Sequence, residues 1–497
     1  LNKMKNVQII GSGFSSLFAA CYLAQAGYSV DVYEKNDSLG GRARAFQQDG
    51  FTFDMGPSWY WMPDIFERFF NDFGKKTADY YELVRLNPAY KVFFEDNETV
   101  EVPGSIEEIY TLFDSIESGS ASKLEKFINS AAFNYKASMD ELVYRPGNSI
   151  LELVTPQTVT RVNQFFSTVR SAIRKDFTNP KLIKILEFPI LFLGAKPENT
   201  PAFYNFMNYA DLVLGTWYPM GGMFKIVEAM VALGKELGVT FHTNAQIEEI
   251  ITEDNAAVGI RINGLIEYSD VVLSGADYHH TEQLLNPESR MYKEDYWASR
   301  TFAPSALIFY VGFDKKLTNV RHHNLFFDED FDQHAVQIYD TPSWPDNPLF
   351  YTCFPSITDS SVAPAGKENA FFLIPLAPGI EDSEERRAHY FDVVMTRLET
   401  LTNQSLKEHV IYTKSFCVDD FKSQYNSYKG NAYGMANTLK QTAFLRPKIK
   451  SKKVENLFFT GQLTVPGPGV PPALISGKIS ANQILKNVKH ELKHANI

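Results

Sequence analysis

The stretch "VQIIGSGFSSLFAACYLAQAGYSVDVYEK", residues 7–35, decides the fold of this protein. Its first apolar residues end at Gly11, as a buried parallel strand does when it runs into a glycine turn. Apolar residues then recur with helical spacing up to Gly27, a residue type favoured at helix C-termini. A second short apolar run ends at Glu34. This order of strand, glycine turn, helix and strand predicts a Rossmann-like unit that binds a dinucleotide.

Each part of this unit has a physical role. Gly11 permits the tight turn, and Gly13 lets the main chain approach a pyrophosphate at the helix N-terminus. Ser16 stands where such patterns have their third glycine, a position that serves close helix–strand packing. Glu34 accepts hydrogen bonds from ribose hydroxyls, which favours an adenosine without a 2′-phosphate. The first part of the predicted cofactor site is therefore Gly11, Gly13, Phe14, Ser15, Ser16, Glu34 and Lys35.

The segment "LGGRARAFQQDGFTFDMGPS", residues 39–58, distinguishes a flavin from a nicotinamide cofactor. Its glycine pair lets the main chain approach the cofactor at a second place, and Arg42 brings a cation to the phosphates of the cofactor. This order is typical of flavoproteins with two dinucleotide-binding domains, so we expect FAD. The alternative is a glycine hairpin with Arg42 exposed to solvent. The contacts predicted here are Gly40, Gly41, Arg42, Gly56, Pro57 and Ser58.

Two later regions complete the expected flavin site. "YSDVVLSGAD", residues 268–277, predicts a strand that returns to the cofactor sheet, and in similar flavoproteins the Ile247 position offers its main chain to the adenine. "LFFTGQLTVPGPGVPPALISGK", residues 457–478, predicts a strand, a Gly/Pro turn and a helix that begins at 470–472. Amides at such a helix start suit the flavin O2 carbonyl, where negative charge develops on reduction; the alternative is a plain buried turn. These regions add Ile247, Ala276, Gly461, Gln462, Gly469, Val470 and Pro471.

The composition limits the partners and the compartment of this protein. The net charge of −11, from 48 basic and 59 acidic residues, disfavours nucleic acid because no global positive field attracts phosphates. Three widely spaced cysteines argue against a disulfide framework and a metal cluster, and indicate a reducing, cytosolic compartment. No apolar run has the length needed to span a bilayer. The 39 Phe and 25 Tyr residues predict large apolar surfaces, either core or the lining of a site for a bulky apolar ligand.

The whole chain resembles the bacterial-type carotenoid desaturases, the phytoene desaturase group of the amine-oxidase-like flavoproteins. The motifs that carry the resemblance are "GGRA" (40–43), "DMGPSWYWMPDIFERFF" (54–70), "YPMGG" (218–222), "NAYG" (431–434), "FLRP" (444–447) and "GQLTVPGPGVPPALISGK" (461–478). The chain departs from the pattern at Ser16. It also departs at residues 59–61, where a segment that is usually more aliphatic and small reads Trp-Tyr-Trp.

The resemblance implies an α/β fold, with a discontinuous Rossmann-like FAD-binding domain of the amine-oxidase and glutathione-reductase type and an α+β substrate domain. The FAD-binding domain is expected from residues 4–70, 215–285 and 450–497. A mostly helical insertion, residues 71–214, serves the substrate and the membrane, and residues 286–449 supply a sheet-containing substrate domain with strands from Ser305 and Asn369.

The implied activity is FAD-dependent removal of two hydrogens from a carotenoid, which creates a conjugated double bond. Such C–H bonds lack useful acidity, so the flavin must accept a hydride, and the residues nominate no catalytic acid or base. Trp59, Tyr60 and Trp61 are expected to line the substrate channel, where Tyr60 or an indole N–H meets a terminal hydroxyl; ordinary core packing is the alternative.

These aromatic residues favour 3,4-desaturation of a hydroxylated or monocyclic, γ-carotene-type carotenoid. Multi-step phytoene desaturation, amine oxidation and a non-catalytic flavin or isoprenoid escort role are the alternatives. The final electron acceptor is expected to be a quinone or oxygen.

A C40 hydrocarbon is insoluble in water, so the enzyme must take it from a bilayer through a monotopic patch. Residues 161–193 fit this role, because apolar residues are mixed there with cations that only Asp176 and Glu187 oppose within the segment. The location is therefore expected to be cytoplasmic, peripheral to the inner face of the cell membrane; an ordinary basic surface helix is the alternative. The apolar members are Phe165, Phe166, Ile183, Ile185 and Leu186, and the cations are Arg161, Arg170, Arg174, Lys175, Lys181 and Lys184.

Overall fold

The N-terminal strand–helix–strand unit forms as predicted. In the computed structural model, which describes residues 5–438 and 440–495, β1 (Asn6–Ile10) and β2 (Ser29–Tyr33) pair in parallel. Helix α1 (Phe14–Gln25) connects them and is buried along most of its length. Its apolar residues pack on the sheet, so the glycine turn before it lies at the carboxyl edge of β1.

A five-stranded parallel sheet surrounds this unit, in the order β19–β13–β1–β2–β9. The added strands are β9 (Thr240–His242), β13 (Val271–Ser274) and β19 (Leu457–Phe459). The sheet is thus assembled from three separated parts of the chain, which confirms the predicted discontinuous Rossmann-like fold. The domain boundaries themselves stay a prediction, and residues 4, 496 and 497 lie outside the described residues.

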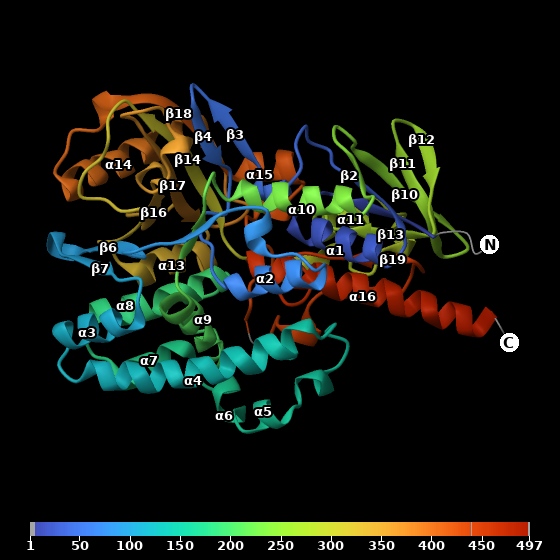
Figure 1. Ribbon diagram of the computed structural model, residues 1–497, viewed down its shortest axis with the longest axis horizontal. Helices are drawn as coiled ribbons and strands as arrows, with labels where there is room; N and C mark the ends of the chain where they lie inside the picture. Colours follow the sequence, from blue (N-terminus) through green and yellow to red (C-terminus); the bar gives the residue numbers. More distant parts are fainter. Residues whose placement is uncertain (1–4, 439, 496–497) are drawn as a thin grey trace.

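Helices α10 (Phe224–Glu236) and α16 (Val470–Ala495) pack against α1 (Figure 1). A three-stranded antiparallel sheet of β10 (Ile247–Glu253), β11 (Ala256–Ile262) and β12 (Leu265–Tyr268) lies beside the parallel sheet. Several shorter elements lie around and between the two halves of the molecule: α2 (Pro63–Asp72), α11 (Tyr278–Gln283), α12 (Glu294–Ala298) and α15 (Val418–Tyr425), with strand pairs β3 (Ala45–Gln48) and β4 (Phe51–Asp54), and β5 (Leu83–Arg85) and β8 (Trp217–Pro219).

A seven-stranded mixed sheet forms the second half, in the order β18–β14–β17–β16–β15–β6–β7. Its strands are β6 (Tyr90–Phe94), β7 (Thr99–Val102), β14 (Ser305–Phe313), β15 (His323–Phe327), β16 (Phe350–Cys353), β17 (Glu368–Leu376) and β18 (Val410–Phe416). The strands predicted from Ser305 and Asn369 are confirmed. Strands β6 and β7 come from the stretch that was expected to be mostly helical, because their alternating and aromatic residues complete the edge of this sheet.

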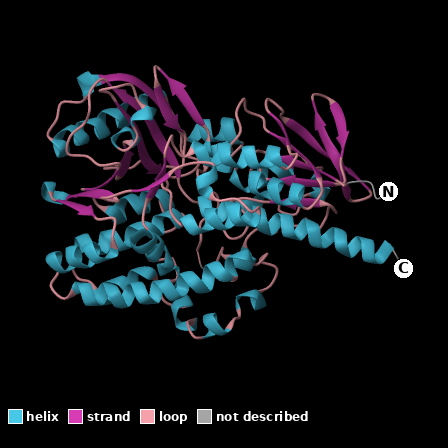
Figure 2. Cartoon of the chain, in the orientation of Figure 1, coloured by secondary structure: helices cyan, strands magenta, loops and turns pink. Residues whose placement is uncertain are grey.

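Strand β14 is buried on both faces, which explains its continuous apolar sequence. On one face, Phe309 and Val311 belong to the same core cluster as Val394, Met395 and Leu398 of α14 (Glu384–Thr402). The other face of the sheet is turned toward the helical part of the chain (Figures 1 and 2). That helical part consists of α3 (Ile106–Ile116), α4 (Ser120–Asp140), α5 (Pro156–Val159), α6 (Val162–Phe165), α7 (Val169–Asp176), α8 (Pro180–Glu187) and α9 (Phe206–Tyr209), with α13 (Phe331–Tyr339) beside it.

Candidate active site

A single cavity of about 580 Å³ connects the two halves of the molecule. It begins at the carboxyl edge of the parallel sheet, where the turn after β1 lines it. It continues over β14, β15, β16 and β17 and reaches the helical part of the chain. Ligands bind at this edge in open α/β sheets, so the cavity lies where the glycine pattern predicts a cofactor.

The residues predicted to bind the cofactor converge on this cavity, although they are far apart in the sequence. Of the twenty predicted positions, nineteen line it, and Ser16 does not. Ser16 is completely buried on the side of α1 that faces the sheet, where a Cβ atom on Gly275 would come within 2.0 Å of its Oγ. The predicted cofactor contact at Ser16 is therefore corrected: this small side chain packs α1 against the end of β13. The lining members are Gly11, Gly13, Phe14, Ser15, Glu34, Lys35, Gly40, Gly41, Arg42, Gly56, Pro57, Ser58, Ile247, Ala276, Gly461, Gln462, Gly469, Val470 and Pro471.

The free space beside Gly13 indicates a ligand most directly. Its φ of −67° and ψ of 170° are open to any residue, and no heavy atom lies within 4 Å of the position where a Cβ would be. Neither backbone strain nor packing within the protein therefore requires a glycine here. The free space belongs to the cavity at the start of α1, where main-chain amides favour an anion. The arrangement fits a dinucleotide pyrophosphate.

Glu34 is held rigidly at the end of β2. Its Oε2 accepts hydrogen bonds from the main-chain N–H and the Oγ of Ser12, at 3.1 and 2.6 Å. Its Oε1 accepts from the main-chain N–H and the Nδ2 of Asn36, at 3.0 and 2.8 Å. The carboxylate is 4 % exposed and lines the cavity, so its orientation is set before a ribose arrives.

Arg42 supplies a cation to the lining of the cofactor groove. Its Nη2 donates to Ser427 Oγ at 3.1 Å and to the Asn431 carbonyl at 3.4 Å, while its buried Nε has no partner. Burial lowers the pKa of the guanidinium, and the nearby Asp277 opposes that effect. Among the described residues, no carboxylate oxygen lies within 4 Å of this cation, so it is available to a phosphate group.

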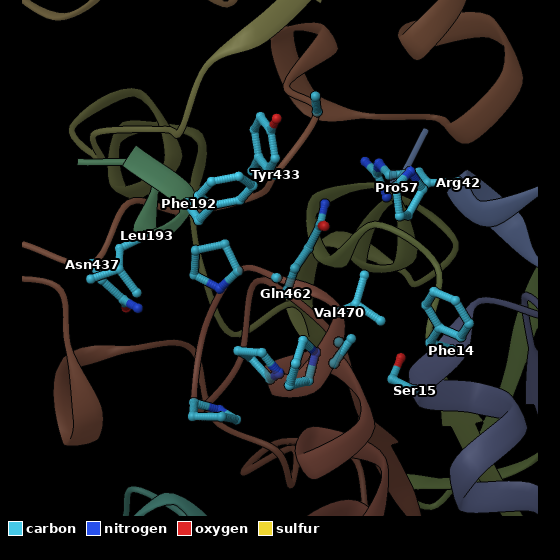
Figure 3. A pocket seen from close by; sticks show the side chains of 18 of the residues that line it. Phe14, Ser15, Arg42, Pro57, Phe192, Leu193, Tyr433, Asn437, Gln462 and Val470 are labelled. Carbon is cyan, nitrogen blue, oxygen red and sulfur yellow. The ribbon is translucent and has the colours of Figure 1, made fainter. Parts of the chain in front are cut away.

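The C-terminal helix α16 begins at Val470, as predicted, and its first residues line the cavity (Figure 3). The loops beside it are organised by Arg446, which is 2 % exposed and for which the sequence suggested no role. Its guanidinium donates to the carbonyl oxygens of Met435, Gln441, Gln462 and Thr464 and to Asn437 Oδ1, at 2.7–3.2 Å. A buried arginine leaves no pattern in a single sequence, although it belongs to the quoted "FLRP" motif.

The aromatic run at residues 59–61 divides between the cavity and the core. Trp59 and Trp61 line the cavity, and the Trp59 ring stacks on His323 at 4.0 Å. Tyr60 points the other way: it stacks on Phe66 at 4.2 Å, and its hydroxyl bonds Tyr81 Oη at 2.8 Å. The predicted substrate contact at Tyr60 is therefore corrected, because neighbouring residues of an extended segment face opposite sides.

Beyond the cofactor groove the cavity widens into an apolar chamber, part of which Figure 3 shows around Phe192 and Leu193. Its walls come from the helical part of the chain and from the seven-stranded sheet, segments that no local pattern relates. Most of these residues were therefore not predicted from the sequence. The apolar lining includes Phe188, Leu191, Phe192, Leu193, Phe203, Phe206, Ile308, Leu325, Phe327, Leu373 and Val465.

Comparison with known proteins agrees with this geometry. The model of the family described as flavin containing amine oxidoreductase matches residues 15–485. The chain belongs to this family. It is 42% identical to the carotenoid 3,4-desaturase of Haloarcula japonica, over 97% of this chain and 99% of that protein. It is 30% identical to a 4,4'-diapophytoene desaturase (4,4'-diaponeurosporene-forming) of Staphylococcus haemolyticus, with the same coverage of both chains.

Solved structures of low sequence identity share the fold of this flavoprotein. An oxidoreductase from Methanosarcina mazei aligns with a TM-score of 0.62 at 17% identity, covering 95% of this chain and 99% of its own. Putrescine oxidase aligns with a TM-score of 0.63 at 13% identity, covering 97% and 99%. The protein is an FAD-dependent oxidoreductase, and the resemblance to carotenoid desaturases is confirmed.

The basic segment 161–193 of this oxidoreductase differs from its predicted form. Arg170 pairs with Glu187, Glu198 and Asp332, and Arg174 also pairs with Glu187. Lys181 pairs with Glu98, and Lys184 with Glu95. Acidic residues outside the segment thus oppose Arg170, Lys181 and Lys184, while Arg174 pairs with Glu187 inside it, and Ile185 and Leu186 are buried. These cations are not a free patch for lipid head groups. Among the described residues, no helix is long and apolar enough to cross a membrane.

Proposed function

We propose that this oxidoreductase desaturates a carotenoid, introducing the 3,4 double bond into a hydroxylated or monocyclic, γ-carotene-type chain. The observation that carries the proposal is the continuity of the FAD groove with a chamber lined by aromatic and aliphatic side chains. A chamber of this kind suits a long apolar molecule and offers it to the flavin without passage through water. The greater identity to a carotenoid 3,4-desaturase than to a diapophytoene desaturase supports the position of the new bond.

We infer that the nineteen lining residues named above hold FAD, with the pyrophosphate beside Gly13 and Arg42, the adenosine ribose at Glu34 and the flavin ring near the start of α16. When bound, FAD supplies the hydride acceptor that an unactivated C–H bond requires. The protein supplies the space at Gly13, a fixed carboxylate and a cation on the phosphates. Its chamber excludes water, and the faces of Trp59 and Trp61 favour positive charge that develops along the polyene. No side chain is assigned as catalytic acid or base.

A direct comparison of substrates tests this proposal. The FAD-loaded enzyme is given phytoene in one set of liposomes and a hydroxylated γ-carotene-type carotenoid in another, and the products are separated by chromatography. We expect a longer conjugated chain only from the second substrate, with oxygen or a quinone as the final electron acceptor. Conversion of phytoene alone would support multi-step phytoene desaturation, and conversion of neither would contradict the proposed function.

We further propose that the enzyme takes its substrate from the membrane surface, at the cytoplasmic face. The supporting feature is a cluster of exposed apolar side chains on residues 150–166, which we call the apolar rim. Leu151 is 74% exposed and Phe166 is 86% exposed. Leu142, Val143, Leu153 and Phe165 of the same region line the cavity, so the apolar rim lies at an entrance to the chamber. Its exposed members are Ile150, Leu151, Val154, Val159, Val162 and Phe166.

The apolar rim can be tested with a variant in which Leu151, Val154 and Phe166 are changed to serine. Each side chain that enters the bilayer interface contributes about 1.5 kcal/mol or more, so we expect liposome binding to fall at least tenfold while FAD content is unchanged. The matched control changes Leu265 and Tyr268 of β12 to serine, since these exposed side chains are 71% and 64% accessible and lie outside the cavity lining. Equal binding by both variants would contradict the assignment.

A further inference from the structure

The sequence suggested that Tyr60 or a tryptophan N–H meets a hydroxyl of the substrate, but the structure engages Tyr60 and Trp61 elsewhere, and the Trp59 ring is stacked on His323. The Tyr60 hydroxyl is bonded to Tyr81, and Trp61 Nε1 donates to Thr216 Oγ1 at 2.9 Å. We propose instead that Tyr433 and Tyr339 form a hydroxyl-recognising pair in the chamber, which selects carotenoids with a hydroxyl group near the reacting end. This inference rests on the proposed desaturase function and names the specificity residues of that site.

Tyr433 lines the cavity at the border between the cofactor groove and the chamber. Figure 3 shows it next to Phe192, with Gln462 below. The Gln462 amide, in the orientation that satisfies both its neighbours, donates to the Tyr433 carbonyl oxygen at 3.2 Å and accepts from Arg42 at 3.1 Å. Tyr433 is therefore tied through one side chain to a predicted flavin contact.

The loop that carries Tyr433 has little freedom to move. Asn431 Oδ1 accepts a hydrogen bond from the Gly434 N–H at 2.7 Å, and Asn431 Nδ2 donates to the Tyr428 carbonyl at 2.7 Å. Gly434 has a φ of +97°, and a Cβ at this position would come within 2.7 Å of the Gln462 side chain. The main chain at Tyr433 is thus positioned before a substrate binds, which reduces the entropy lost on binding.

Tyr339 is the last residue of α13 and also lines the cavity. Burial raises the pKa of Tyr339, and Tyr433 adds to this effect. Burial also raises the pKa of Tyr433, to about 12. Both phenols are neutral at physiological pH, so each hydroxyl can donate one hydrogen bond and accept another.

Neither of these two hydroxyls makes a hydrogen bond to another described residue, which distinguishes them from Tyr204, Tyr351 and His334 of the same lining. Tyr204 Oη bonds Thr442 Oγ1 at 2.7 Å, and Tyr351 Oη lies 2.7 Å from His323 Nδ1 and donates to Ser58 Oγ at 2.9 Å. Both ring nitrogens of His334 have main-chain partners.

A hydrocarbon chain would leave the hydroxyls of Tyr339 and Tyr433 unsatisfied in the apolar chamber, whereas a substrate hydroxyl bonds them. A site of this kind discriminates against the analogue that lacks the group. Because Tyr433 is linked to Gln462, the hydroxylated end of the carotenoid lies on the flavin side of the chamber. Desaturation at a terminal position requires that placement.

The test compares the wild-type holoenzyme with Tyr433→Phe, Tyr339→Phe and the double variant. Each removes a hydroxyl and keeps the ring. Two substrates of equal conjugation are used, a hydroxylated carotenoid and its hydrocarbon counterpart, and KM and kcat are measured for both. Binding is measured separately on dithionite-reduced holoenzyme, which cannot accept a hydride, by quenching of tryptophan fluorescence. Tyr412→Phe, on β18 and outside the cavity lining, is the matched control.

We expect each single variant to weaken binding of the hydroxylated carotenoid about fivefold, the effect of one net hydrogen bond, with unchanged or improved binding of the hydrocarbon. The double variant should lose most of the preference, and the control should keep it. Equal weakening of both ligands, or no change for either, would overturn the inference. The proposed function fails separately, if the wild-type enzyme converts neither substrate, because the binding ratio on the reduced enzyme does not depend on turnover.

Discussion

Ser12 Oγ donates a 2.6 Å hydrogen bond to Glu34 Oε2, which joins the glycine turn after β1 to the end of β2. The same Ser12 Oγ accepts from the Gly40 N–H at 3.0 Å. One hydroxyl thereby connects the glycine turn, Glu34 and Gly40, which belong to two separate motifs of the sequence. This network orients the Glu34 carboxylate before a ribose binds, so less side-chain entropy is lost on binding.

Glu34→Ala should weaken FAD binding by roughly tenfold to a hundredfold, since hydrogen bonds to a charged group contribute about 1.5–3 kcal/mol each. Flavin fluorescence during titration of the apoprotein measures the dissociation constant. Asp31→Asn on the same strand is the control, because Asp31 bonds His242 Nε2 and does not line the cavity. Equal affinities of the Glu34→Ala variant and the wild type would show that this carboxylate does not contact the ribose.

Gly13→Val should still fold, with stability lowered by about 1 kcal/mol because valine is a poorer N-cap of α1, and should fail to retain FAD, because its Cβ projects into the free space of the cavity. Gly27→Ala is the matched control. Its φ of +89° disfavours alanine, so stability falls by about 1 kcal/mol, while its distance from the cavity lining leaves FAD bound. Melting temperature and the absorbance ratio at 450 and 280 nm report both effects. A Gly13→Val protein with full FAD content would refute the predicted pyrophosphate position.

Arg446→Lys should lower the free energy of unfolding by about 2–4 kcal/mol, because a lysine cannot satisfy the five acceptors that the guanidinium now bonds. FAD affinity should fall as well, since the Gln462 loop loses its support. Urea unfolding gives the first quantity. The control is the exposed Arg386→Lys, whose guanidinium lies over the Trp344 ring and for which we expect a change within about 0.5 kcal/mol. Equal stability of the two variants would contradict this role.

Asp211 should make stability depend on pH. Burial raises its pKa to about 7, and the hydrogen bond from Tyr90 Oη, at 2.9 Å, opposes this only in part. The folded protein therefore keeps a proton that the unfolded chain releases, so the free energy of unfolding falls as pH rises from about 4 to about 7. The difference amounts to about 4 kcal/mol.

Asp211→Asn removes this titration. Relative to the wild type, the variant should gain stability between pH 4 and pH 7, and the difference should be constant above pH 7. Urea unfolding of both proteins at several pH values measures it. Parallel stability curves across this range would show that Asp211 does not carry the proton.

The sequence predicts more of the lining residues in the cofactor half of the cavity than in the substrate half. In the cofactor half, nineteen of the twenty residues proposed to hold FAD line the cavity, because a glycine turn, a helix start and a strand-end carboxylate are local features with characteristic spacing. Ser16 is the exception there. The substrate half was predicted poorly: Tyr60 turned out to belong to the core, and most of the chamber wall was missed.

The sequence by itself determined the Rossmann-like unit, the FAD cofactor and the start of α16, since each depends on residues that are neighbours along the chain. Only the tertiary structure decided which side chains share the chamber, because Phe192, Leu373 and Tyr433 meet there from three separate segments. It also decided that Lys184 faces Glu95 and that Arg446 holds the Gln462 loop. Charge pairing and burial depend on distance in space, and a single sequence records only distance along the chain.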